Sequence, residues 1–174
     1  NEQIPENYLI GKRHLTDDEI AILKKNGNNN VDSSWQNFYV SKEEGAFNPE
    51  LIHSTLFSGF IILGKVQPVE LQYNDLHLLC GIQNSRVSNI VVGDHCAIRD
   101  VHYLDNYILG ERVILFNVQE MCCTNHAKFG NGILKEGEPE EHRVWIGIAN
   151  ENEGRAVLPF EDMIPADAYL WSHY

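Results

Sequence analysis

A repeat of 17 residues is the feature that most restricts how this sequence can fold. Val92-Gly93-Asp94 and Leu109-Gly110-Glu111 share the order apolar, glycine, acidic, and they lie 17 residues apart. The apolar residues that follow match at the same offset, pairing Ile98 with Leu115, Val101 with Val118 and Leu104 with Met121. A repeat of this kind predicts stacked units, because one short unit cannot bury its own apolar face.

The spacing of apolar residues within this region fits neither a helix nor an alternating strand. Apolar side chains recur in steps of five or six residues, at Ile82, Val87, Val92, Ile98, Leu104, Leu109, Leu115 and Met121. Such steps predict a three-sided coil, in which each short strand places one side chain inward and glycine relieves crowding at a turn. We expect Val92 to lie beneath Leu109 and Ile98 beneath Leu115.

The charge balance excludes two classes of partner. With 13 basic and 25 acidic side chains, the 174-residue chain carries a formal charge of −12. It therefore lacks the cationic surplus that binding to a nucleic-acid backbone or to an anionic membrane surface requires. The sequence also has no apolar run of about 18 residues, the length that a membrane helix needs.

The four cysteines predict a cytoplasmic protein with reduced thiols. They form no CxxC pair, and Cys122 and Cys123 are neighbours that cannot easily bridge each other. We expect these two adjacent thiols to be small buried hydrophobic groups rather than metal ligands.

The clearest helix of the sequence is predicted from Leu15 to Gly27. Thr16 and Glu19 have the spacing of a capping box, and Gly27 supplies a stop signal. Beyond it, the aromatic and β-branched residues from Trp35 to Val40 and from Leu56 to Val66 predict strands.

The repeats resemble the hexapeptide-repeat family of left-handed parallel β-helices, many of whose members are acyltransferases or sugar-phosphate nucleotidyltransferases. The resemblance is closer to a long bacterial family of this type whose members often carry the label glucose-1-phosphate thymidylyltransferase. The motifs that carry it are Gly81-Ile82-Gln83-Asn84-Ser85, Val92-Gly93-Asp94, Phe129-Gly130-Asn131-Gly132 and Asn150-Glu151-Asn152-Glu153-Gly154-Arg155-Ala156-Val157. Because members of that family are several times longer, the resemblance implies that this chain is a fragment.

The resemblance and the repeats together predict a mainly β fold. We expect an N-terminal helix with strands over residues 1–66 and left-handed parallel β-helix coils over 67–134. A hairpin and the start of a C-terminal helix would occupy 135–174, with Asp162 as the helix cap. The resemblance further implies a homotrimer.

The function implied by the resemblance is that of a transferase module acting on a sugar phosphate or sugar nucleotide. Acyl-CoA or a nucleotide sugar would be the co-substrate. The alternative is a non-catalytic β-helix scaffold or oligomerisation module of a larger protein, because the sequence shows no complete catalytic set.

Histidine is the general base that hexapeptide acyltransferases commonly use, and the candidates here are His95, His102 and His126. We assign His126 as base and Asn125 as its hydrogen-bonding neighbour, because both lie where the repeat breaks. The alternative is that His126 is an ordinary surface-loop histidine. We expect no metal site, because the histidine spacings do not bring ligands onto adjacent coils.

Two further segments could bind an anion. Arg155 could clamp a phosphate, with Glu151 and Asn150 as substrate-binding neighbours; the same residues could instead form a hairpin turn between 144–149 and 155–160. Ile10-Gly11-Lys12-Arg13-His14 has the cations of a phosphate loop but only one glycine. A solvated basic turn is the alternative there.

Overall fold

A computed structural model describes residues 6–124, 127–128, 132–144 and 160–173. The chain divides into two compact units, Asn1–Thr124 and Asn125–Tyr174. The described elements are η1 (Glu6–Leu9), β1 (Lys12–His14), α1 (Asp17–Lys25), β2 (Asn29–Asn30), β3 (Phe38–Ser41), η2 (Pro49–Leu51), β4 (Ile52–His53), β5 (Leu56–Leu63), β6 (Glu70–Tyr73), β7 (Leu76–Leu79), β8 (Gly81–Gln83), β9 (Arg86–Val92), β10 (Ala97–Arg99), β11 (Leu104–Asp105), β12 (Ile108–Leu109), β13 (Ile114–Phe116), β14 (Met121–Cys122), η3 (Glu140–His142) and α2 (Pro165–His173). No helix within the described ranges is long and apolar enough to cross a bilayer.

The predicted N-terminal helix is confirmed as α1. The Thr16 hydroxyl accepts a hydrogen bond from the backbone N–H of Glu19, and the Glu19 carboxylate accepts one from the backbone N–H of Thr16. Gly27 has a φ of +78°, which glycine adopts without a Cβ penalty, and the chain leaves the helix there. Both ends of α1 are therefore set by local chemistry.

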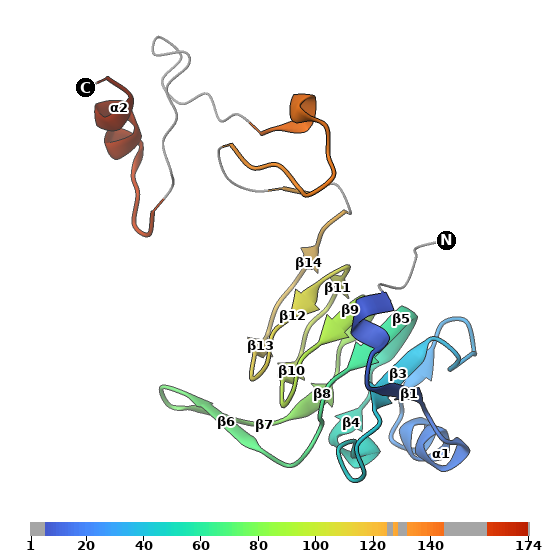
Figure 1. The fold of residues 1–174 in the computed structure, drawn as a ribbon. Coiled ribbons are helices and arrows are strands. Elements are labelled where there is room, and N and C mark those ends of the chain that lie inside the picture. The colour runs from blue at the N-terminus through green and yellow to red at the C-terminus, as the bar shows by residue number, and fades with distance from the viewer. Residues whose placement is uncertain (1–5, 125–126, 129–131, 145–159, 174) are drawn as a thin grey trace. The chain divides into compact units, whose positions relative to one another are not determined.

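The first unit consists of three sheets (Figure 1). One has eight strands, in the order β1-β3-β5-β9-β11-β14, with β12 also paired to β9 and β2 to β5. It is mixed, because β1 runs antiparallel to β3 while the other pairs are parallel. A parallel sheet has the order β13-β10-β8-β4, and β6 and β7 form an antiparallel pair.

The expected left-handed parallel β-helix over residues 67–134 is therefore wrong, because the chain forms mixed sheets. One physical reason lies in residues 70–79, which the prediction counted as coil. Asn74 takes a left-handed φ of +54° and starts a two-residue turn, so this segment folds back as the β6–β7 hairpin. Leu71 and Leu78 of the hairpin are buried with Ala97.

The register predicted from the 17-residue repeat is confirmed. Ile98 pairs with Leu115, Leu104 with Met121 and Val92 with Leu109. The repeated glycine allows the close approach of successive strands, because a Cβ added to Gly93 would lie 2.6 Å from the carbonyl carbon of Gly110. The repeat thus specifies which strands pair, although it does not specify the fold class.

Left-handed residues form columns at the turns between the stacked strands. Ser54, Asn84, Asp100 and Asn117 all have φ between +45° and +54°. The backbone N–H of Asp100 donates to the carbonyl of Gln83, and that of Asn117 donates to the carbonyl of Arg99. The Asn84 amide also donates to the Asp100 carboxylate at 2.7 Å. Small polar side chains tolerate this conformation better than other non-glycine residues do.

In the second unit, the described residues form two short helices, η3 and α2, and several local contacts. Ile133 and Val144 are joined by a backbone hydrogen bond, and Arg143 pairs with Glu140. The predicted C-terminal helix is present as α2, which begins at Pro165 and not directly after Asp162. The predicted hairpin turn at 150–154 lies outside the described residues.

Candidate functional site

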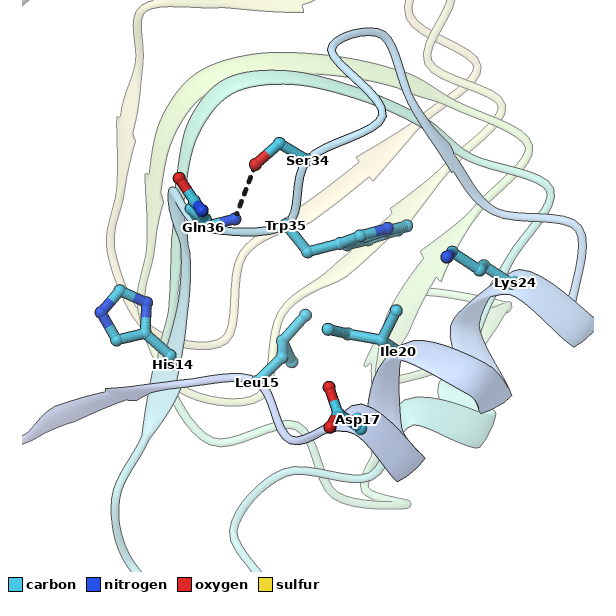
Figure 2. A pocket seen from close by; sticks show the side chains of 8 residues that line it. All are labelled: His14, Leu15, Asp17, Ile20, Lys24, Ser34, Trp35 and Gln36. Carbon is cyan, nitrogen blue, oxygen red and sulfur yellow. Dashed lines mark hydrogen bonds between the residues drawn. The ribbon is translucent and has the colours of Figure 1, made fainter.

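A hollow of about 520 Å³ lies beside α1 and is the candidate site (Figure 2). It is lined by His14 at the end of β1, by one face of α1 and by the loop that precedes β3; the lining residues are His14, Leu15, Asp17, Ile20, Lys24, Ser34, Trp35 and Gln36. Its volume falls within the range of about 300–1,000 Å³ that is typical of small-molecule pockets.

The α1 side of the pocket follows from helical spacing. Asp17, Ile20 and Lys24 are three and four residues apart, so they share one face of the helix. Asn28, which is 4% exposed, holds the end of this helix against β4. Its amide donates to the carbonyls of Leu23 and Ile52 at 2.9 and 2.7 Å, and its oxygen accepts from the backbone N–H of Thr55.

The floor of the pocket is apolar. Figure 2 shows the Trp35 indole above Leu15 and Ile20, with Lys24 at one end of the ring and His14 and Gln36 at the other. The indole is 8% exposed, and its ring centroid lies 5.7 Å from that of Phe38 and 6.1 Å from that of Phe57. These contacts join the floor to the main core, against which Leu15 and Ile20 also pack.

The rim carries polar side chains without protein partners. Within the described ranges, the side chains of Asp17, Lys24 and Gln36 make no hydrogen bond or ion pair, and the centroid of the His14 ring lies 4.6 Å from that of the Tyr39 ring. The rim therefore presents donors and acceptors of both charges to a ligand, which fix the orientation of a small molecule in such pockets.

Of the residues considered as a phosphate loop, Lys12 and Arg13 make structural contacts, whereas His14 lines the pocket. Lys12 and His14 belong to β1, and the Lys12 ammonium donates to the carbonyl of Leu63 at 2.8 Å. Burial lowers the pKa of Lys12. Arg13 forms a two-pronged pair with Glu19 at 2.7 and 2.8 Å, and this pair raises the pKa of Arg13 and lowers that of Glu19.

The predicted catalytic residues His126 and Asn125 lie outside the described residues, as do the predicted substrate-binding residues Arg155, Glu151 and Asn150. Of the other histidines considered, His102 is exposed, and His95 is partly buried with its Nδ1 unpartnered in the described part of the chain. Nothing in the described residues gathers three or more His, Cys, Asp or Glu side chains in a geometry suited to a metal ion.

The four cysteines differ in burial. Cys80 and Cys96 are buried, and burial raises the pKa of Cys80 to about 11. Cys122 is exposed and Cys123 is half-buried, so the expectation of two buried thiols there is wrong. Cys122 lies at the end of β14, where no described strand covers its outer side.

The pocket was not found by sequence reasoning, because its residues come from three elements and match no motif. Two signals could have indicated it. Asp17, Ile20 and Lys24 have a spacing that places polar and apolar groups on one helix face, and Trp35 lies between the polar residues Ser34 and Gln36.

The fold and the pocket define a mainly β module with a helix-lined pocket in its described residues. Residues 12–174 match a family model described as "Domain of unknown function (DUF4954)". The chain belongs to this family. It is similar to an "Uncharacterized protein" of Treponema pallidum (strain Nichols), with 39% identity over 160 residues that cover 92% of this chain. These residues span 21% of the relative's length. No solved structure matches the chain.

These findings correct the family assignment made from the sequence. The matched family and the similar protein carry no hexapeptide-repeat or glucose-1-phosphate thymidylyltransferase description. The assignment to the hexapeptide-repeat family is therefore wrong. The motifs that suggested it, such as Gly81 to Ser85, belong to parallel strands and their turns, which other folds share.

Proposed function

We propose that this chain is a binding module for a sugar phosphate or a sugar nucleotide, with the pocket beside α1 as its site. The observation that carries the proposal is the combination of an apolar floor, formed by Leu15, Ile20 and Trp35, with a rim of unpartnered polar side chains. A pyranose ring has the matching chemistry, because its apolar face can contact the floor while its hydroxyls hydrogen-bond to the rim.

The rim charges support a phosphorylated sugar over a neutral one. The Lys24 ammonium is the flexible point charge that binds phosphate oxygens, and His14 can donate from the opposite end. Asp17 and Gln36 can accept hydrogen bonds from sugar hydroxyls. The proposal concerns binding alone and includes no step of bond cleavage.

Calorimetric titration of the chain with a hexose 1-phosphate, a nucleoside diphosphate hexose and the free hexose tests the proposal. We expect saturable binding of at least one phosphorylated ligand. Lys24→Gln should weaken it by about tenfold, the loss of one charge-assisted hydrogen bond, and should leave binding of the free hexose unchanged.

Lys25→Gln is the matched control, because Lys25 is an exposed neighbour on the same helix that does not line the pocket. It removes the same charge and should leave affinity within about twofold. If no phosphorylated sugar binds, or if the two variants weaken binding equally, the proposed site is wrong.

A further inference from the structure

The last strands of the stacked sheets present an apolar face that is only partly covered. We call β13 and β14, with Val113, Leu115, Val118 and Met121, the last layer. The layer before it comprises β10 and β11, with the residues that precede these four by 17 positions: Cys96, Ile98, Val101 and Leu104. Each residue of the last layer thus has an equivalent one layer inward.

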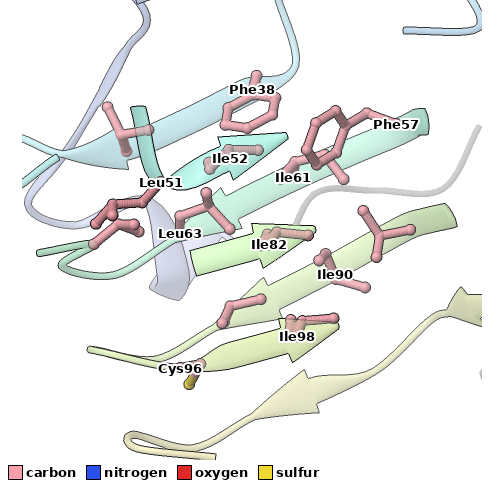
Figure 3. Packing of buried hydrophobic residues seen from close by; sticks show 14 of the residues in the cluster. Phe38, Leu51, Ile52, Phe57, Ile61, Leu63, Ile82, Ile90, Cys96 and Ile98 are labelled. Atoms are coloured by element: carbon pink, nitrogen blue, oxygen red, sulfur yellow. The ribbon is translucent and has the colours of Figure 1, made fainter. Parts of the chain in front are cut away.

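Burial differs sharply between these equivalent positions. In the inner layer, Cys96 is 5% exposed, and Ile98, Val101 and Leu104 are each 0% exposed. All four equivalents in the last layer are only partly buried. Figure 3 shows Ile82 and Ile98 at matching positions of the paired strands β8 and β10. Within the described residues of the first unit, the last layer therefore repeats the inward residues of a core layer without an equivalent layer over it.

A column of glycines ends at the same place. A Cβ on Gly64 would lie 2.6 Å from the carbonyl carbon of Gly93, and a Cβ on Gly93 would lie 2.6 Å from that of Gly110. A Cβ on Gly110 would meet nothing within 4 Å, and its φ is not in the left-handed region. The backbone conformation at position 110 therefore does not require glycine. The absence of a side chain there would instead allow another backbone to approach closely, as happens at Gly64 and Gly93.

The backbone is also open on this side. In the described sheets, β12, β13 and β14 each pair with a strand on one side alone, so alternate N–H and C=O groups of these edge strands face outward. At the opposite end, β1, β2 and β4 also pair on one side alone, but α1 packs against the core there with Leu23 fully buried and so covers apolar side chains. In stacked-layer proteins a terminal layer needs such a cover, and the described residues of the first unit supply none over the last layer.

We propose that a further layer of parallel strands, supplied by the longer polypeptide of this family, pairs with and packs on the last layer. The occupant would add apolar side chains over Leu115 and Met121 and bring its backbone against Gly110, in the same register that joins the existing layers. The Treponema pallidum relative has the chain length for this, because the matched residues span 21% of it. This inference does not depend on the proposed sugar-phosphate site.

Hydrogen exchange followed by mass spectrometry tests whether the last layer is covered. The measurement compares this chain with the full-length Treponema pallidum relative, both without substitutions. In this chain, amides of residues 108–121 should exchange faster than those of 87–104 at every protein concentration. In the relative, the amides aligned with 108–121 should exchange at least about tenfold more slowly than in this chain, approaching the inner layer.

Two results would overturn the proposal. Equally fast exchange of the aligned amides in the full-length relative would mean that no further layer covers them. If instead exchange of 108–121 in this chain slows with rising concentration while sedimentation shows a dimer, the occupant is a second copy and not a further layer.

Discussion

Asn28 is the residue that joins the pocket helix to the sheets. Its three hydrogen bonds satisfy two carbonyls and one N–H in a buried position, where unpaired polar groups are costly. We expect Asn28→Ala to reduce the free energy of unfolding by about 2–4 kcal/mol, measured by urea denaturation.

The neighbouring Asn29 provides the control for this prediction. Asn29 is exposed, and its side chain accepts one local hydrogen bond, from the backbone N–H of Asn30. Asn29→Ala should change stability by no more than about 0.5 kcal/mol. Similar losses for both variants would show that the buried network does not anchor α1.

The sequence alone does not distinguish these two asparagines. Asn28, Asn29 and Asn30 form a polar run that indicates a loop, but Asn29 and Asn30 instead form the short strand β2, which pairs with β5. Which amide turns inward depends on where Ile52 and Thr55 lie, about 25 residues further along the chain. Contacts over such separations are decided by packing and not by local preference.

At the scale of single elements, α1 is stabilised by the pair between Glu19 and Arg13. The hydrogen bond from Arg13 lowers the pKa of Glu19 below its ordinary value of 4.5. A carboxylate whose pKa is lower in the folded state than in the unfolded state stabilises the fold at pH values above its unfolded-state pKa. This stabilisation is lost as the pH falls through its folded-state pKa. The contribution of Glu19 is thus complete at neutral pH and disappears in acid.

Glu19→Gln should therefore lower the thermal midpoint at pH 7, corresponding to up to about 1 kcal/mol. The difference in thermal midpoint between the variant and the wild type should disappear as the pH falls below about 4. Thermal unfolding followed by circular dichroism between neutral and acid pH measures both effects. Asp18→Asn, which removes a first-turn charge without affecting Arg13, is the control, and a gap that stays constant with pH would contradict the assignment.

Elements with local determinants were the ones that sequence reasoning could predict. The capping box fixed where α1 begins, and the 17-residue repeat fixed the pairing of Ile98 with Leu115. The antiparallel pairing of β1 with β3 and the β6–β7 hairpin were missed, because short strands carry little information about their partners. The prediction of the fold class was wrong for this reason. The pocket was missed because residues of β1, α1 and the loop before β3 form it together.

At the scale of the whole molecule, burial decreases toward the last layer, and stability should follow the same gradient. Ile98→Ala should cost about 3–4 kcal/mol, because Ile98 is fully buried and its loss leaves a cavity. Leu115→Ala at the equivalent position should cost about 1 kcal/mol, because Leu115 is partly exposed. Urea denaturation of both variants measures the difference, and equal losses would mean that Leu115 is as buried in solution as Ile98.

The position of α1 also has a consequence for how the chain is made. Because α1 closes the end of the stack that contains the earliest strands, a ribosome releases the closed end first. From β10 onward, each strand then emerges beside a finished partner that lies about 16 or 17 residues earlier in the sequence, whereas β8 and β9 pair with strands about 30 residues earlier. Pairing over such short separations costs little loop entropy. Synthesis and folding can thus proceed in the same direction, with one new edge exposed at a time.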